Sequence, residues 1–140
     1  MTCECDLMEE SILKDVRVAC NVEQDDSGFD GQLIPLINSQ LMVAHEFGVG
    51  YDGFLVKGEG ETWAELLGEE GSKLAAIKTW LGYSVLLLFD PPDNGTVLKS
   101  YQDQVLKLEY MLRNKSCRDG YVKEYVPEMA AFYDELLDLD

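Results

Sequence analysis

Few residues of this chain combine a type and a spacing that would support catalysis. His45 is the only histidine, so any Ser-His or Cys-His nucleophilic arrangement has to use it. It falls late in an expected helix, beside Glu46 and near the core face, where a helix-end or packing histidine is the simpler interpretation. A hydrolase that depends on His45 is therefore the weakest of the alternatives that the sequence leaves open.

Acidic residues and cysteines are present, but not in patterns that make a site. Among 27 acidic residues, carboxylate pairs such as Asp25-Asp26 occur by chance and do not indicate general acid-base catalysis. Asp25, Asp26 and Asp30 do not have the spacing of a calcium loop. The cysteines lack the paired Cys-x-x-Cys spacing of a zinc site, and we expect free thiols at Cys3, Cys5, Cys20 and Cys117. We predict no enzyme, with no catalytic residue, metal or cofactor.

A glycine pattern at residues 48–53 has the letters of a dinucleotide-binding loop, Gly-Val-Gly-Tyr-Asp-Gly. Such a loop works by placing a pyrophosphate on backbone amides at the start of a helix that follows a strand. Here an expected helix precedes the glycines and an extended apolar run follows them, and Asp52 lies inside the pattern. We therefore interpret the segment as a loop or hairpin insertion, and not as a nucleotide site.

Two segments carry apolar residues outside the regular helices, which is typical of protein contacts. The first is the glycine-rich insertion of about 48–68, whose candidate contact residues are Tyr51, Phe54, Leu55 and Trp63. The alternative is a loop that folds back over the helices.

The second segment is an acidic, aromatic C-terminal arm, residues 119–140. From Pro127 onward its apolar residues repeat at helical spacing and predict an amphipathic helix of about three turns. A helix this short is marginal alone in water, so it must dock on its own body or fold against a partner. One copy would bind weakly, whereas many copies on a ring would bind firmly. The candidate contact residues of the arm are Tyr121, Tyr125, Met129, Phe132, Tyr133, Leu136 and Leu137.

These segments extend from a body, residues 1–118, that we predict to be an all-α, small helical bundle. Helical periodicity predicts a helix at about 9–20 with Ile12, Val16 and Ala19 on its apolar face, and a second that begins at Phe29 or, with Pro35 in its first turn, at Ile34. A brief turn runs from Thr62 to Gly68. A third helix, apolar on nearly all sides and therefore central, is capped by Ser72, and Thr96 opens a fourth.

The net charge of −16 and the pI near 4.2 argue against a protein that grips nucleic acid or an anionic membrane. A surface past which DNA slides without sticking would also be acidic. No stretch approaches twenty apolar residues, and the N-terminus is acidic where a signal peptide would be basic. We therefore expect a protein that is made in the cytosol and does not enter a membrane.

The order of these parts resembles the head-tail connector, or adaptor, proteins of long-tailed bacteriophages. The resemblance covers roughly residues 10–117. It is carried by the early helix Ser11-Ile-Leu-Lys-Asp-Val-Arg-Val, the acidic turn Glu23-Gln-Asp-Asp-Ser, the helix from Leu33 to Phe47, the turn Thr62-Trp-Ala-Glu-Leu-Leu67, the helix that contains Ala75-Ala-Ile-Lys-Thr-Trp-Leu-Gly-Tyr, and the Pro91-Pro92 break.

The resemblance implies a structural virion protein that forms a dodecameric ring beneath the portal, extends the DNA channel and links the head to the stopper and tail. It further implies that the apolar arm residues contact the portal protein, while the four loop residues join subunits or meet the stopper. DNA would pass through the lumen without specific binding. The protein would reside at the head-tail interface of the virion, after assembly in the host cytoplasm.

The rival interpretation is a small acidic regulatory protein, for example a DNA mimic that inhibits a host DNA-binding enzyme. The strong negative charge and an amphipathic acidic helix suit that role. Its binding would weaken as salt is raised, whereas docking of a connector should depend more on apolar burial.

Overall fold

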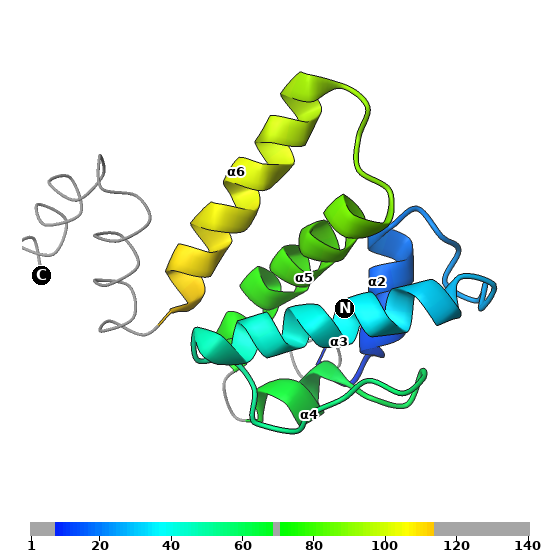
Figure 1. Ribbon diagram of the computed structural model, residues 1–140. Coiled ribbons are helices and arrows are strands. Elements are labelled where there is room, and N and C mark those ends of the chain that lie inside the picture. Colours follow the sequence, from blue (N-terminus) through cyan, green and yellow to red (C-terminus); the bar gives the residue numbers. More distant parts are fainter. Residues whose placement is uncertain (1–7, 69–70, 114–140) are drawn as a thin grey trace, which may run out of the picture.

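The computed structural model describes residues 8–68 and 71–113 (Figure 1). The described residues confirm the all-α class and contain no strand. Their elements are α2 (Ile12–Ala19), α3 (Asp30–Glu46), α4 (Trp63–Leu67), a 3-10 turn η1 (Gly71–Lys73), α5 (Leu74–Phe89) and α6 (Gly95–Leu112). The insertion is a loop and not a hairpin, because its one described bridge pairs Thr62 with Ser11. The predicted helix of the C-terminal arm lies outside the described residues.

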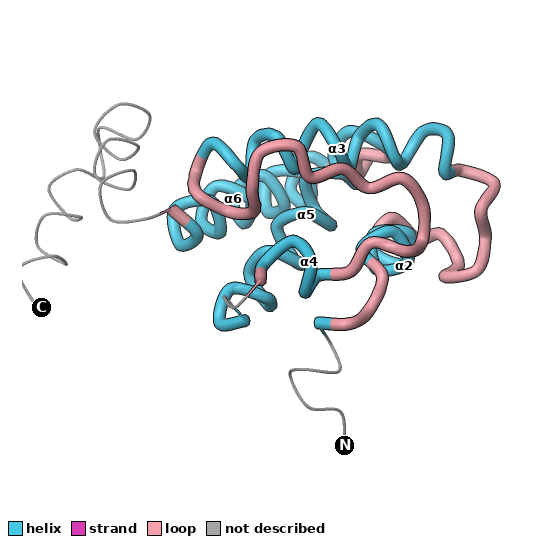
Figure 2. Tube along the Cα trace, turned by 90° about the horizontal axis from the view of Figure 1, so that it is seen from below, coloured by secondary structure: helices cyan, strands magenta, loops and turns pink. Residues whose placement is uncertain are grey.

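Helix α5 is central, as its apolar sequence predicted. It packs against α2, α3 and α6, which surround it in Figures 1 and 2. Its side chains Ile77, Leu81 and Val85 are fully buried. The closest approach is at Gly82, where an added Cβ would lie 2.8 Å from the Cβ of Ala19 on α2. A side chain at this position would push the two helices apart.

Helix starts follow from capping side chains, although Ser72 is not the cap that we expected and Thr96 is not the first residue of its helix. Ser72 lies in η1, and α5 begins at Leu74 without a side-chain cap. Helix α6 is opened by Asn94, and not by Thr96, because the Asn94 side chain accepts from the backbone N–H groups of Thr96 and Val97. The Thr62 cap of α4 is confirmed, since its hydroxyl accepts from the N–H of Glu65.

Helix α3 begins earlier than the position of Pro35 suggests. The preceding turn already supplies helical hydrogen bonds, from the N–H of Leu33 to the carbonyl of Phe29 and from the N–H of Asp30 to that of Ser27. Leu33 is fully buried, which fixes this turn against the core. Pro35 therefore lies inside the helix, where it cannot donate to the carbonyl four residues before it, and the helix starts at Asp30 and not at Ile34.

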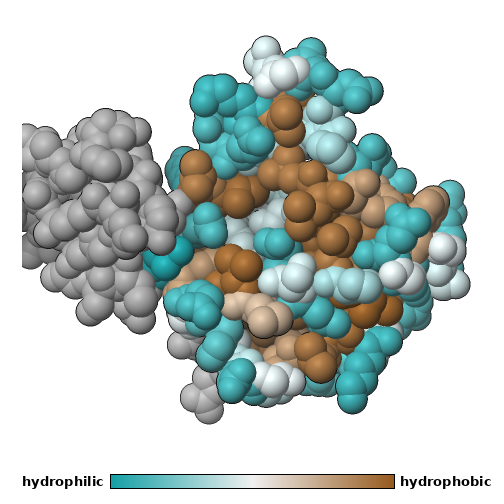
Figure 3. Space-filling view, viewed as in Figure 1, coloured by the Kyte–Doolittle hydropathy of each residue, from teal (hydrophilic) through white to brown (hydrophobic). Residues whose placement is uncertain are grey.

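Part of the surface remains apolar. Helices α3 and α6 both pack on α5 but make few contacts with each other. Figure 3 shows apolar side chains between these two helices, on the face that is turned to the viewer in Figure 1. The loop and α4 lie on the other side of α3 from α6 in Figure 1.

Candidate functional site

The loop that follows α3 starts at a well-defined helix end. The N–H of Val49 donates to the carbonyl of Ala44, and the N–H of Gly48 donates to that of His45. Gly48 has a φ of 99°, and both Val49 and Ala44 are buried. This is the Schellman arrangement, in which a left-handed glycine ends the helix and an apolar contact supports the turn. The direction in which the chain leaves α3 is therefore fixed.

The far side of the loop is also anchored to the helices. The Asn38 side chain on α3 donates to the carbonyl of Val56 at 2.9 Å and accepts from its N–H at 2.8 Å. Near the end of the loop, the N–H of Ile12 donates to the carbonyl of Glu61, and the N–H of Trp63 donates to that of Glu10. Residues 56–63, which we call the loop base, are thus held by α3 and by the start of α2.

Arg17 on α2 ties the loop base to two other segments. Its Nε and Nη2 donate to the two carboxylate oxygens of Asp30 at 3.0 and 2.6 Å, which is a bidentate pair. Its Nη1 donates to Glu59 and to the carbonyl of Gln24, at 2.6 and 2.7 Å. One guanidinium therefore joins α2, the turn before α3, the start of α3 and the loop base.

The burial of Arg17 corrects the predicted apolar face of the first helix. Arg17 is fully buried beside Ile12, Leu13 and Val16, whereas Ala19, which was placed on that face, is exposed. The hydrogen bonds with Asp30 raise the pKa of Arg17 above its ordinary range, although burial opposes this, so the side chain stays charged. The available signal was an arginine four residues after Leu13, a spacing that places it on the buried side.

The loop base contains a second polar cluster around Glu61 and Trp63. Glu61 accepts from the backbone N–H groups of Lys57 and Gly58. Burial favours a higher pKa for Glu61, but these hydrogen bonds outweigh it and lower the pKa. Trp63, expected at a partner surface, is fully buried, and its indole N–H donates to Asp15 at 2.6 Å. In this structure Trp63 packs in the core next to the loop base and has no exposed surface that a partner could contact.

Residues 51–55 form the loop tip, which is exposed. Tyr51 and Leu55 keep about half of their surface in contact with solvent, at 55% and 49%. Phe54 is half-buried, and its ring meets the Tyr51 ring edge to face at 5.4 Å between centroids. These three predicted contact residues therefore lie together and remain accessible, and Trp63 does not join them.

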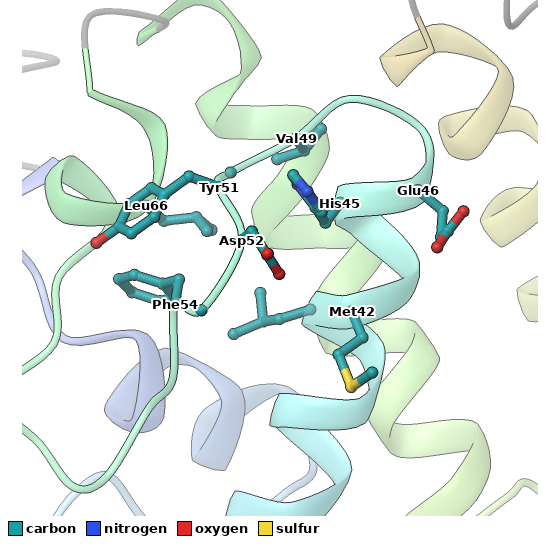
Figure 4. A pocket seen from close by; sticks show the side chains of 11 residues that line it. Met42, His45, Glu46, Val49, Tyr51, Asp52, Phe54 and Leu66 are labelled. Atoms are coloured by element: carbon teal, nitrogen blue, oxygen red, sulfur yellow. The ribbon is translucent and has the colours of Figure 1, made fainter.

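A pocket of about 130 Å³ lies between the loop tip and the C-terminal half of α3 (Figure 4). Its buried walls are Leu41, Val49 and Leu66. In Figure 4, Tyr51 and Phe54 lie on one side of the pocket and Met42 on the other, with the Asp52 carboxylate between them. The sequence did not indicate this pocket, because Leu41, Met42 and Leu66 follow ordinary helical patterns and the turn at residues 48–50 brings them together.

The side chains that line the pocket do not form a catalytic arrangement. His45 lines it but is exposed, so its expected place near the core face is wrong, while its place at the helix end is confirmed. Within residues 8–68 and 71–113, no three His, Cys, Asp or Glu side chains are grouped as metal ligands.

Cys20 is a free thiol, and burial, with a contribution from Asp90, raises its pKa to about 11. No helix in the described part is long and apolar enough to span a membrane.

The predicted portal contacts of the arm lie outside the described residues. These are Tyr121, Tyr125, Met129, Phe132, Tyr133, Leu136 and Leu137. The last described residue, Arg113, has its guanidinium 5.2 Å from the centre of the Phe47 ring, at the end of α3. The described part of the chain therefore ends beside the start of the loop.

Comparison with known proteins matched the helical body to a family. The model of the family described as "Phage connector protein" matches residues 12–119, which include all the described helices. Searches of curated proteins and of solved structures found no match.

Proposed function

Since the chain belongs to the phage connector protein family, we propose that it is a head-tail connector subunit. In this proposal twelve copies form a ring beneath the portal, extend the DNA channel and link the head to the stopper and tail. The observation that supports it is the family match across the whole helical body. The protein would then be part of the virion neck, after assembly in the host cytoplasm.

The proposed subunit has two parts with different tasks. The body, residues 1–118, builds the ring, and the arm, residues 119–140, docks on the portal through its apolar stripe. The stripe is expected to bury Phe132, Leu136 and their apolar neighbours, and the acids on the other side of the helix stay in water. The family match ends where the arm begins, so the arm is the part of the chain free to suit a particular portal.

The loop tip is the proposed contact with a neighbouring subunit or with the stopper. Tyr51, Phe54 and Leu55 are accessible and lie on a loop whose base is fixed, so a partner would bind them without first having to order the loop. Trp63 has a supporting role in this proposal, because its burial leaves it nothing to offer a partner directly.

The charge of the chain suits passage of DNA and not its capture. A net charge of −16 in 140 residues repels phosphates, and lasting attachment to DNA requires clustered Lys and Arg. We propose that acids facing the lumen keep the genome from adhering as it is packaged and ejected.

The proposal is tested by a tagged pull-down from the infected or induced cell, identified by mass spectrometry. The full-length chain should recover a large portal-like protein, and a chain truncated after Gly120 should not. Circular dichroism of the truncated chain should show a folded helical body. Loss of helical folding would instead place the arm in the core of the body and contradict a separate docking arm.

A matched pair of arm variants separates connector docking from the acidic regulator. Leu136→Asp interrupts the apolar stripe, and Glu135→Gln removes one acid from the other side of the predicted helix. Docking by apolar burial predicts that only Leu136→Asp abolishes recovery of the portal. Recovery of a host nuclease or DNA-binding protein, lost as salt is raised and weakened by Glu135→Gln, would overturn the connector proposal.

A further inference from the structure

The pocket behind the loop tip has the features of a preformed receptor for one apolar side chain. Its walls are the buried side chains Leu41, Val49 and Leu66. Its volume of about 130 Å³ is similar to that of cavities of about 150 Å³ that hold a benzene-sized group. One leucine, methionine or phenylalanine side chain therefore matches it in size.

The pocket also presents an uncompensated negative charge. Asp52 is exposed, its carboxylate lies between the two sides of the pocket in Figure 4, and it forms no ion pair with the described residues. A side chain that enters the pocket beside Asp52 gains most if a lysine or arginine accompanies it.

The pocket exists before any partner arrives. Gly50 has a φ of 79°, and a Cβ on it would lie 2.8 Å from Cδ1 of Leu66 in the pocket wall. The Schellman turn at Gly48 fixes one end of the tip, and the pair of hydrogen bonds between Asn38 and Val56 fixes the other. Binding there would not have to supply the entropy cost of ordering the loop.

Helix α6 carries a matching pair of side chains. Met111 is 55% exposed, and Lys107, which is also exposed, forms no ion pair with the described residues. The two are four residues apart and thus share one face of the helix.

We propose that this pocket receives Met111 from α6 of a second copy of the chain, with Lys107 of that copy pairing with Asp52. Methionine suits the site because its unbranched, flexible side chain adapts to irregular pockets. Within one chain, α3 lies between α6 and the loop (Figure 1), so the two halves of the contact are separate surfaces of each molecule. Such a head-to-tail contact generates a ring when the rotation between copies closes.

This inference rests on the proposed ring and names the surfaces that would hold its subunits together. It does not involve the arm, so the two proposals fail in different experiments. Capture of the portal tests the arm, and contacts between copies test the pocket.

Charge exchange tests the contact by sedimentation velocity over a range of concentrations. Asp52→Lys and Lys107→Asp, each alone, should weaken association between copies by about tenfold. The two changes in one chain should restore association. Every contact then pairs a lysine at position 52 with an aspartate at position 107 of the next copy, so opposite charges meet again. Lys99→Asp is the matched control, since it makes the same charge change on α6 where Lys99 pairs with Asp103. Failure of the double variant to recover would overturn the proposal.

Site-directed cross-linking tests the contact directly and also detects weak association between copies. In a chain whose native cysteines are replaced, Asp52→Cys in one tagged copy and Lys107→Cys in another should be joined by a short bis-maleimide. Lys99→Cys in place of Lys107→Cys should give much less product. The reaction is run at the highest soluble concentration and on material captured with the portal. No product above the control in either sample would show that the pocket does not receive α6.

Discussion

The two halves of the loop after α3 have similar glycine-rich compositions but different surroundings. The base has Gly58 and Gly60, and the tip has Gly53, with Gly50 just before it. The base is joined to two helices, α2 and α3, by side-chain hydrogen bonds, whereas the described tip keeps one backbone hydrogen bond, from the N–H of Phe54 to the carbonyl of Tyr51, and one ring contact. Partners supplied by other elements, and not glycine content, determine how many hydrogen bonds hold each half.

This difference assigns a separate role to each half. Changes in the base should act on the stability of the body, because its side chains are buried or paired with buried groups. Changes of the exposed side chains in the tip should act on binding to a partner and leave stability within about 0.5 kcal/mol. The variants below test that separation, from the largest expected effect to the smallest.

Replacing Arg17 should have the largest effect. Arg17→Met removes a fully buried guanidinium and leaves Asp30, Glu59 and the carbonyl of Gln24 without their donor. Breaking a buried, hydrogen-bonded charge pair typically costs about 3–5 kcal/mol, which is a large share of the stability of a small domain. Urea unfolding followed by circular dichroism should show a lower midpoint.

Arg17→Lys is the control for this prediction. Lysine keeps the positive charge but cannot make the bidentate pair with Asp30, so its stability should fall between those of the parent and Arg17→Met. An unchanged midpoint for Arg17→Met would mean that the loop base does not depend on this guanidinium.

Variants of Trp63 and Tyr51 give the clearest comparison between the loop base and the loop tip. Trp63→Phe removes the indole N–H that donates to Asp15 and leaves a void in the core, so unfolding should become easier by about 2 kcal/mol. Tyr51→Ser, at an exposed position, should leave the urea midpoint nearly unchanged and weaken association between copies. The opposite pattern would return Trp63 to the partner surface and place Tyr51 in the core.

The helical body was predictable from the sequence because its signals are local. Apolar periodicity located α5 and identified it as the central helix, and Thr62 marked the start of α4. Of the two starts that the sequence left open for α3, the structure agrees with Phe29 to within one residue and contradicts Ile34, because burial of Leu33 and the turn before Asp30 start the helix ahead of Pro35. Local propensity was overridden there by packing.

The site was only partly predictable because it depends on contacts between distant residues. The loop tip was recognised from Tyr51 and Leu55, which are apolar residues in a glycine-rich setting. The pocket also requires Leu66, which a turn at Gly50 brings against the tip, and the base requires Glu59 to meet Arg17 across 42 positions. Such long-range pairings have no periodic signal in a single sequence.

Two glycines give a matched test of how closely the tip approaches the body. Gly50 and Gly53 both have positive φ, so alanine strains either position by about 1 kcal/mol. Only at Gly50 would the new Cβ also meet Leu66, at 2.8 Å, while nothing lies within 4 Å at Gly53. Gly50→Ala should therefore cost about 1 kcal/mol more than Gly53→Ala in thermal or urea unfolding. Equal costs would show that Leu66 moves aside freely.

The smallest effects, below about 1 kcal/mol, should appear in the pH dependence of stability. The pKa of Glu61 in the loop base is lowered in the folded state, so its ionised form stabilises the fold above the unfolded-state pKa. That contribution disappears as the pH falls through the lowered folded-state pKa. Glu61→Gln should therefore be less stable than the parent near neutral pH, and the difference in unfolding free energy should vanish in acid.

Replacing Glu109 on α6 should change stability in the opposite direction. This variant is therefore the control for the loss of one negative charge. Burial raises its pKa in the folded state, although Arg113 opposes the shift, so its ionised form opposes folding near neutral pH. Glu109→Gln should therefore be more stable than the parent near neutral pH, and this gain should shrink as the pH falls through the raised folded-state pKa. If both variants changed stability in the same direction, overall charge repulsion in this acidic chain would dominate the effect. The hydrogen bonds that Glu61 accepts from Lys57 and Gly58 would then make no separate contribution to the stability of the loop base.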